Sequence, residues 1–67
     1  MGKLYSVIIL NIITNKEYKI TSFGNCVQEV HKHVLFKVLS RNENIESILY
    51  NDECMFDDTT GFFTEKL

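Results

Sequence analysis

The segment Leu4–Thr14 (LYSVIILNIIT) constrains the fold of this chain more than any other stretch of the sequence. It is rich in β-branched and aromatic residues, which predicts a β-strand. Because successive side chains of a strand point to opposite faces, the strand carries two apolar sets. One set is Tyr5, Val7, Ile9 and Ile13, and the other is Leu4, Ile8, Leu10 and Ile12. A single helix covers only one face, so the second is either wrapped by the C-terminal segment or forms an interface with a partner or a second copy.

An antiparallel partner strand is predicted directly after this segment. The run Thr14–Glu17 is typical of a tight turn, in which Asn15 can adopt a positive φ angle. Residues 17–21 then alternate between polar and apolar. A two-residue loop would place Ile13 opposite Tyr18, and Asn11 opposite Ile20. The helix-facing side of the hairpin would then hold Val7, Ile9, Ile13, Tyr18 and Ile20.

The segment from Cys26 to Arg41 predicts an amphipathic helix. Asn25 as N-cap, with Gln28 three residues later, resembles a capping box. The valines of this segment share a narrow arc of the helix, and His31 lies within it. They are Val27, Val30, Val34 and Val38. Because four valines make an intrinsically weak helix, a strand over the same residues is the alternative.

The remaining segments complete an α+β domain. The expected elements, in chain order, are a helix end at 42–44, a third strand at 45–50, a fourth strand or edge at 54–56, a loop at 57–61 and a docking segment at Phe62 and Phe63. We therefore expect an antiparallel sheet of three to four strands, in the order β-β-α-β with a short tail, and one helix packed on one face. Residues 1–67 are expected to form a single domain, near the lower size limit for a hydrophobic core.

The cysteines indicate the cellular compartment of the protein. The charge distribution indicates that one segment is unusually acidic. Cys26 and Cys54 stand in no disulfide-framework spacing, and no secretory signal precedes them. The opening apolar run is too short to span a bilayer. We therefore expect a cytoplasmic protein with two free thiols. The formal net charge is -2, but residues 1–49 carry +2 and residues 50–67 carry -4, so the C-terminal quarter is acidic.

The sequence contains no assembled pattern of catalytic or metal-ligating residues. On a helix, residues two apart point about 200° from each other, so His31 and His33 cannot chelate one ion. We expect one of them to be partly buried and the other solvated. Cys26 with a histidine would be a candidate nucleophile pair, but 67 residues leave little chain for a substrate pocket. The sequence thus predicts no enzyme, no catalytic residue, no cofactor and no bound metal.

Apolar and acidic residues outside the expected core are candidates for contact with a protein partner. Phe36 falls among the charged residues of the helix, where it is either a contact site or a residue covered by Phe62 and Phe63. The acidic residues near the C-terminus lack the pattern of a calcium loop, and predict a solvated loop or a contact with a basic partner surface. The predicted partner-binding residues are Phe36, Leu4, Ile8, Leu10, Ile12, Asp52, Glu53, Asp57 and Asp58.

Two other functions are compatible with the sequence. A nucleic-acid binder would use Lys32, Lys37 and Arg41 along the helix, although acidic residues interrupt this stripe and the net charge is negative. A homo-oligomeric structural protein, such as a homodimer, would bury the outer apolar face of the first strand. No membrane partner is predicted.

In layout, the chain is similar to small phage-encoded host-takeover inhibitors of β-β-α-β type. The matching stretch, Leu4–Tyr50, comprises the hairpin YSVIILNIITNKEYKIT, the helix CVQEVHKHVLFKVL and the strand IESILY. The resemblance implies a protein of the host cytoplasm that occludes a host enzyme and has no chemistry of its own. It covers layout and composition without a diagnostic motif, so it assigns no functional residue.

Overall fold

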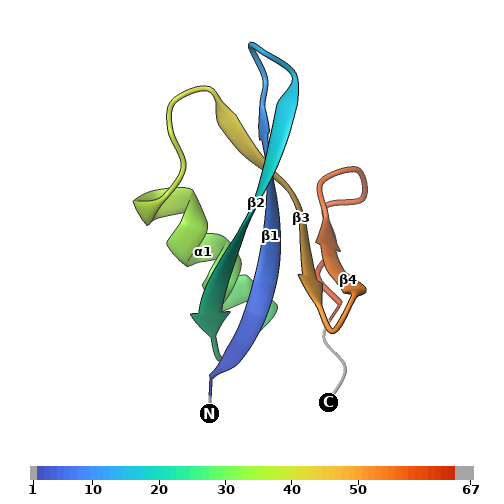
Figure 1. Cartoon of the computed structure of the whole chain (residues 1–67). Helices are drawn as coiled ribbons and strands as arrows, with labels where there is room; N and C mark the ends of the chain where they lie inside the picture. Colours follow the sequence, from blue (N-terminus) through green and yellow to red (C-terminus); the bar gives the residue numbers. More distant parts are fainter. Residues whose placement is uncertain (1, 65–67) are drawn as a thin grey trace.

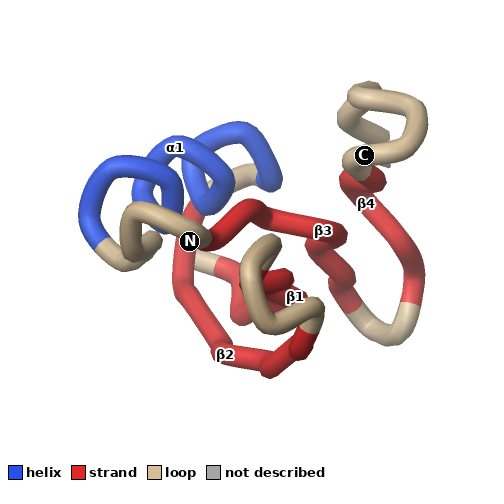
Figure 2. Tube along the Cα trace, turned by 90° about the horizontal axis from the view of Figure 1, so that it is seen from above, coloured by secondary structure: helices blue, strands red, loops and turns tan. Residues whose placement is uncertain are grey.

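The computed structural model describes residues 2–64, which form four strands and one helix. In chain order, the elements are β1 (Lys3–Asn11), β2 (Lys16–Gly24), α1 (Val27–Lys37), β3 (Glu43–Tyr50) and β4 (Glu53–Asp57). All neighbouring strands are antiparallel, in the sheet order β2-β1-β3-β4, and α1 lies on one side of the sheet (Figure 1, Figure 2). The α+β fold expected from the sequence is confirmed, and the segment around residues 54–56 is a fourth strand at the edge of the sheet.

The hydrophobic core lies between α1 and the face of the sheet that it covers. In β1, Tyr5, Val7 and Ile9 are fully buried, as the alternation of the strand predicts. The helix contributes its buried valines to the same cluster, and the last two strands complete it. These residues are Val27, Val30 and Val34 of α1, Ile45 and Ile48 of β3, and Met55 and Phe56 of β4. Every buried side chain of the core is apolar, so burial of apolar surface is its main source of stability.

Two β-bulges let β3 and β4 bury residues at spacings that a regular strand does not allow. Side chains alternate in a regular strand, so Ile45 and Ile48 reach the same face only if one residue between them is extra. The pairing of β3 with β1 shifts at this point and leaves Glu46 as that residue. A second shift, between β3 and β4, lets the neighbouring residues Met55 and Phe56 both be buried.

The turn between β1 and β2 is longer than the sequence predicts. β1 ends at Asn11, and a four-residue turn follows, with Asn15 at a φ of 60° as expected. The Asn11 side chain stabilises this early end, because its Oδ1 atom accepts the backbone N–H groups of Ile13 and Thr14 at 2.9 and 3.0 Å. Ile13 was expected opposite Tyr18 in the helix-facing layer; it lies instead in the turn and is 71% exposed.

The longer turn changes which residues of β1 and β2 pair with each other. Within the two strands, each side chain still lies on the face that the sequence predicts. The structure pairs Asn11 with Lys16, Ile9 with Tyr18 and Val7 with Ile20. Direct partners on neighbouring strands share a face, so Tyr18 and Ile20 lie on the helix-facing side, as predicted. Ile12 does not continue the outer side of β1. It belongs to the turn, where its backbone N–H donates to the carbonyl oxygen of Asn42 at 2.8 Å.

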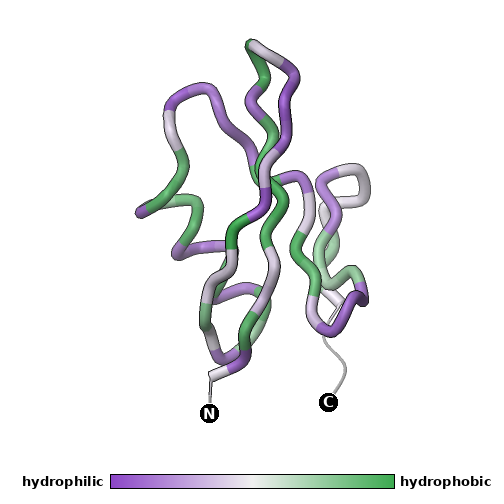
Figure 3. The backbone as a smooth tube through the Cα atoms, viewed as in Figure 1, coloured by the Kyte–Doolittle hydropathy of each residue, from purple (hydrophilic) through white to green (hydrophobic). Residues whose placement is uncertain are grey.

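The helical interpretation of the third segment is confirmed, with different ends. Cys26 occupies the N-cap position, and no side chain caps the first turn. The predicted capping box is absent because Asn25 lies one residue too early, and its Nδ2 atom donates to the Glu29 carboxylate at 3.3 Å instead. The helix ends at Lys37, four residues before Arg41. The loop that follows begins with the apolar Val38 and Leu39 and is hydrophilic nearer β3 (Figure 3).

The Glu43 carboxylate accounts for the early end of the helix. It accepts the backbone N–H of Ser40 at 2.8 Å and the hydroxyl of Tyr18 at 2.6 Å. The Ser40 N–H group is therefore satisfied outside the helix, where the chain turns toward β3. The hydrogen bond from Tyr18, followed by that from Ser40, lowers the pKa of Glu43 below its ordinary value, and the same bond raises the pKa of Tyr18.

Candidate functional site: the outer face of the sheet

The side of the sheet that faces away from α1 carries a distinct set of side chains, which we call the outer face. Within residues 2–64, α1 is the only helix, and it packs against β2 and β3 from behind the sheet as seen in Figure 1. Strand pairing places these residues on the outer face: Leu4, Ser6, Ile8 and Leu10 of β1, Glu17, Lys19, Thr21 and Phe23 of β2, Asn44, Ser47 and Leu49 of β3, and Cys54 and Asp57 of β4. The bulge residue Glu46 lies next to Ser47.

One end of the outer face is apolar. Leu4 and Phe23 are direct partners across β1 and β2, and are 49% and 71% exposed. On the other side of β1, the half-buried Leu49 extends the same patch onto β3, and Ile8 extends it toward the centre of the sheet. These four residues form the apolar end. Exposed apolar residues that are direct neighbours, as Leu4 and Phe23 are, are typical of a contact surface, whereas scattered ones are not.

The opposite end of the outer face carries the carboxylates of Glu17, Glu46 and Asp57, and Asp58 follows in the turn after β4; we call these four residues the acidic cluster. Glu17 of β2 pairs with Leu10 of β1, and Glu46 occupies the bulge of β3, so their side chains meet across β1 and share a hydrogen bond. Asp57 is the last residue of β4, the strand next to Glu46. Asp58 follows it, and its backbone N–H donates to the carbonyl oxygen of Glu46 at 2.9 Å.

The acidic cluster raises the pKa of Glu46 above its ordinary value. The largest cause is the hydrogen bond with Glu17, because two carboxyl groups share such a bond only when one is protonated. Burial and the negative charges of Glu17, Asp57 and Asp58 act in the same direction. Lys19 lies on the outer face too, two residues from Glu17 and directly across from Ile8.

Replacing Glu46 by glutamine is expected to stabilise the protein at neutral pH. Because the folded pKa of Glu46 is raised, its contribution to stability is present below the unfolded pKa of about 4.5 and is lost as the pH rises through the folded value. Glutamine keeps a hydrogen-bonding group without the charge. The Tm of Glu46→Gln should therefore exceed that of the wild type at neutral pH by a few degrees, and the two should converge in acid.

Thermal melts followed by circular dichroism across this pH range measure the effect. Glu29→Gln, which removes a carboxylate from α1 outside the cluster, is the matched control and should give no such increase. Equal Tm values for wild type and Glu46→Gln at neutral pH would show that the carboxylates do not repel one another.

The structure separates the acidic residues that the sequence grouped together. Asp52 lies in the turn between β3 and β4, at a φ of 64°, and Glu53 begins β4. Asp57 and Asp58 lie at the other end of the same strand, about 13 Å away at the usual rise per residue. Only this second pair belongs to the acidic cluster. Glu65 lies outside the described residues.

Four residues of the apolar end and the acidic cluster were not predicted as site residues: Phe23, Leu49, Glu17 and Glu46. Glu17 could have been found from the alternation of the second strand. Phe23 lies beyond the predicted alternation of residues 17–21, but β2 continues to Gly24 and places Phe23 outward. Glu46 had no signal in the sequence, because its position depends on the bulge in β3.

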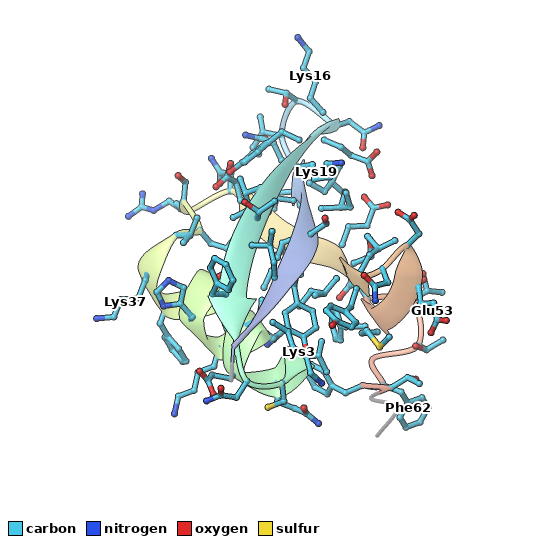
Figure 4. All side chains as sticks on the ribbon, turned by 60° about the horizontal axis from the view of Figure 1, so that its bottom comes forward. Lys3, Lys16, Lys19, Lys37, Glu53 and Phe62 are labelled. Atoms are coloured by element: carbon cyan, nitrogen blue, oxygen red, sulfur yellow. The ribbon has the colours of Figure 1, made fainter. Side chains whose placement is uncertain are left out.

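Phe36 lies on the solvent side of α1 and is 70% exposed, as the helical periodicity predicts. The alternative, in which Phe62 and Phe63 cover it, is wrong. Phe63 packs against His31 and Phe56, with ring centroids 5.2 and 4.9 Å apart. Phe62 is exposed and points away from the sheet (Figure 4).

The surface around Phe36 forms a hollow of about 250 Å³. It is lined by Glu29, Lys32, His33, Phe36 and Lys37. All five residues lie on one helix, so no second element closes the hollow over a ligand. Lys37 extends into solvent (Figure 4). Arg41, which was expected to continue this basic stripe, lies in the turn beyond the end of the helix.

The histidines and cysteines occupy separate places. His31 is half-buried and His33 is exposed, as expected. Burial lowers the pKa of His31, and the charge of Asp58 opposes this shift to a smaller extent. Cys26 and Cys54 are free thiols. Among residues 2–64, no group of three or more His, Cys, Asp or Glu side chains is arranged to hold a metal ion.

Comparisons with protein-family models, with curated proteins and with solved structures gave no match. Within residues 2–64, no helix has the length and apolar character needed to cross a membrane. The outer face is therefore interpreted from its own residues.

Proposed function

We propose that this protein is a non-catalytic binding module that docks onto a partner protein through the outer face of its sheet. The observation that carries this proposal is the apolar end, where Leu4 and Phe23 stay exposed side by side. On the opposite face of β1, which α1 covers, Tyr5 and Val7 are fully buried in the core. The outward side chains add little to that core, and leaving them in water is unfavourable unless another surface covers them.

The surroundings of the apolar end also suit a protein interface. Phe23 is a large aromatic residue of the kind that anchors interfaces, because it buries much surface with little loss of side-chain freedom. Polar side chains flank it on the same face and would form the rim. They are Ser6, Lys19, Thr21 and Ser47.

The module is proposed to act by occlusion, covering a functional surface of a partner enzyme without chemistry of its own. This is the mode of action that the resemblance to small phage-encoded inhibitors implies. A reducing cytoplasm is the proposed location, because the exposed Cys54 would be open to oxidation elsewhere.

Replacing Phe23 by lysine is expected to weaken capture of the partner by roughly tenfold or more, since a charge would enter the centre of the apolar end. The measurement is co-purification of tagged protein with a stoichiometric partner from cells that encode it, followed by titration of that partner. Phe36→Lys is the matched control, because it makes the same change at an equally exposed aromatic residue on α1.

The control variant should bind as the wild type does. If Phe36→Lys abolishes capture and Phe23→Lys does not, the helix is the contact surface and the proposal is wrong. Light scattering of the purified protein completes the test, because a stable dimer that Phe23→Lys dissociates would assign the outer face to self-association.

A further inference from the structure

We infer that the partner presents lysine or arginine side chains to the acidic cluster while its apolar residues cover the apolar end. This inference rests on the proposed function and adds the chemistry of the partner. Both regions lie on one face: Leu4 and Phe23 mark one end, and Glu17 and Glu46 mark the other. A single partner surface that covers the first region therefore extends over the second.

The geometry of the acidic cluster favours a cation from outside the chain. Its carboxylates come from three strands: Glu17 lies on β2 across from Leu10, Glu46 occupies the bulge of β3, and Asp57 ends β4. Several negative charges on neighbouring strands attract an incoming cation together. Strand pairing places one cation of the described residues, Lys19, on this face, against the four carboxylates of the acidic cluster.

The cluster costs the isolated chain some stability. Glu46 lies beside Glu17, and the hydrogen bond between them, together with burial and the neighbouring negative charges, raises the pKa of Glu46. A guanidinium or ammonium group between Glu17 and Glu46 would replace that repulsion with attraction, and a guanidinium could bind two carboxylates at once. Binding sites in proteins can hold like charges close together, which lowers the stability of the free protein, because the ligand neutralises these charges when it binds.

A second copy of this chain fits the outer face less well. Face-to-face pairing of two copies would place two acidic clusters within one interface, where residues 2–64 of each copy supply one outer-face cation, Lys19. Like charges in an interface are unfavourable, whereas a basic partner is electrostatically complementary.

Binding of three synthetic peptides tests this inference. They share one leucine pattern and carry lysine, glutamine or glutamate between the leucines. Fluorescence anisotropy should show that the lysine peptide binds the wild type roughly tenfold more tightly than the glutamine peptide at low salt, with the glutamate peptide weakest. The preference should decline as the pH falls and the carboxyl groups protonate.

The double variant Glu17→Gln/Glu46→Gln should lose this preference. Glu29→Gln/Asp52→Asn is the matched control: it removes the same net charge from α1 and from the β3–β4 turn, and should keep the preference. If the control loses the preference equally, or the cluster variant retains it, net charge and not the cluster governs binding, and the inference is wrong. Failure of the lysine peptide to bind the wild type would overturn it as well.

Zero-length carbodiimide crosslinking of the captured partner gives a second measurement, because it joins carboxylates to lysines in contact. Crosslinks from Glu17 or Glu46 to partner lysines support the inference. Crosslinks from these residues to Lys32 or Lys37 of another copy would instead assign the outer face to head-to-tail self-association. If Phe23→Lys abolishes capture while Glu17→Gln/Glu46→Gln does not, the proposed function stands and the inference about charge fails.

Discussion

Replacing Ile9 by alanine is expected to leave most of the protein unfolded in water at room temperature. Ile9 is fully buried, and its strand β1 lies between β2 and β3 in the sheet. Deleting a buried isoleucine side chain down to alanine costs about 2–5 kcal/mol, from lost burial and from the cavity left behind. A core of this size supplies about 3–5 kcal/mol in total, so one such cavity consumes most of it.

Urea denaturation followed by far-ultraviolet circular dichroism measures the loss. Ile13→Ala is the matched control, because it removes the same atoms from a residue that is 71% exposed in the turn. Its free energy of unfolding should stay within about 0.5 kcal/mol of the wild type. A loss at Ile13 as large as that at Ile9 would mean that the strand continues through residue 13, as the sequence pattern alone suggests.

The second large effect is expected at Gly24, the last residue of β2. A Cβ atom at this position would lie 2.5 Å from Cγ2 of Val30 and 3.4 Å from its backbone nitrogen. Val30 is fully buried and β-branched, so it cannot move aside without disturbing the helix–sheet contact. We expect Gly24→Ala to lower the free energy of unfolding by about 1–3 kcal/mol through overpacking.

Two controls isolate the cause. Gly2→Ala adds the same methyl group where its nearest neighbour, Cδ1 of Phe23, is 3.7 Å away, and it should be close to neutral. Combining Gly24→Ala with Val30→Ala should cost less than the sum of the single changes, because the second change removes the clashing atom. Strict additivity in that cycle would rule out the steric contact as the source of the loss.

The extent to which the sequence predicted the candidate site differs from residue to residue. Phe36 and Leu4 were found because helix and strand periods determine which side each faces. Phe23 was missed because Gly24 and Asn25 suggested an early break. The structure shows instead that Gly24 is still part of β2 and is needed for close packing on Val30.

The sequence by itself determined the alternation of the first strand, the apolar arc of the helix and the order of the elements, since these depend on local periodicity and turn residues. Only the tertiary structure decided which apolar side of β1 remained uncovered, and which carboxylates gathered there. The side chain of Asn11 ended the strand early, and the bulge at Glu46 brought that residue to Glu17 across β1. Register and bulges arise from pairing between segments distant in the chain, and no local pattern encodes such pairing.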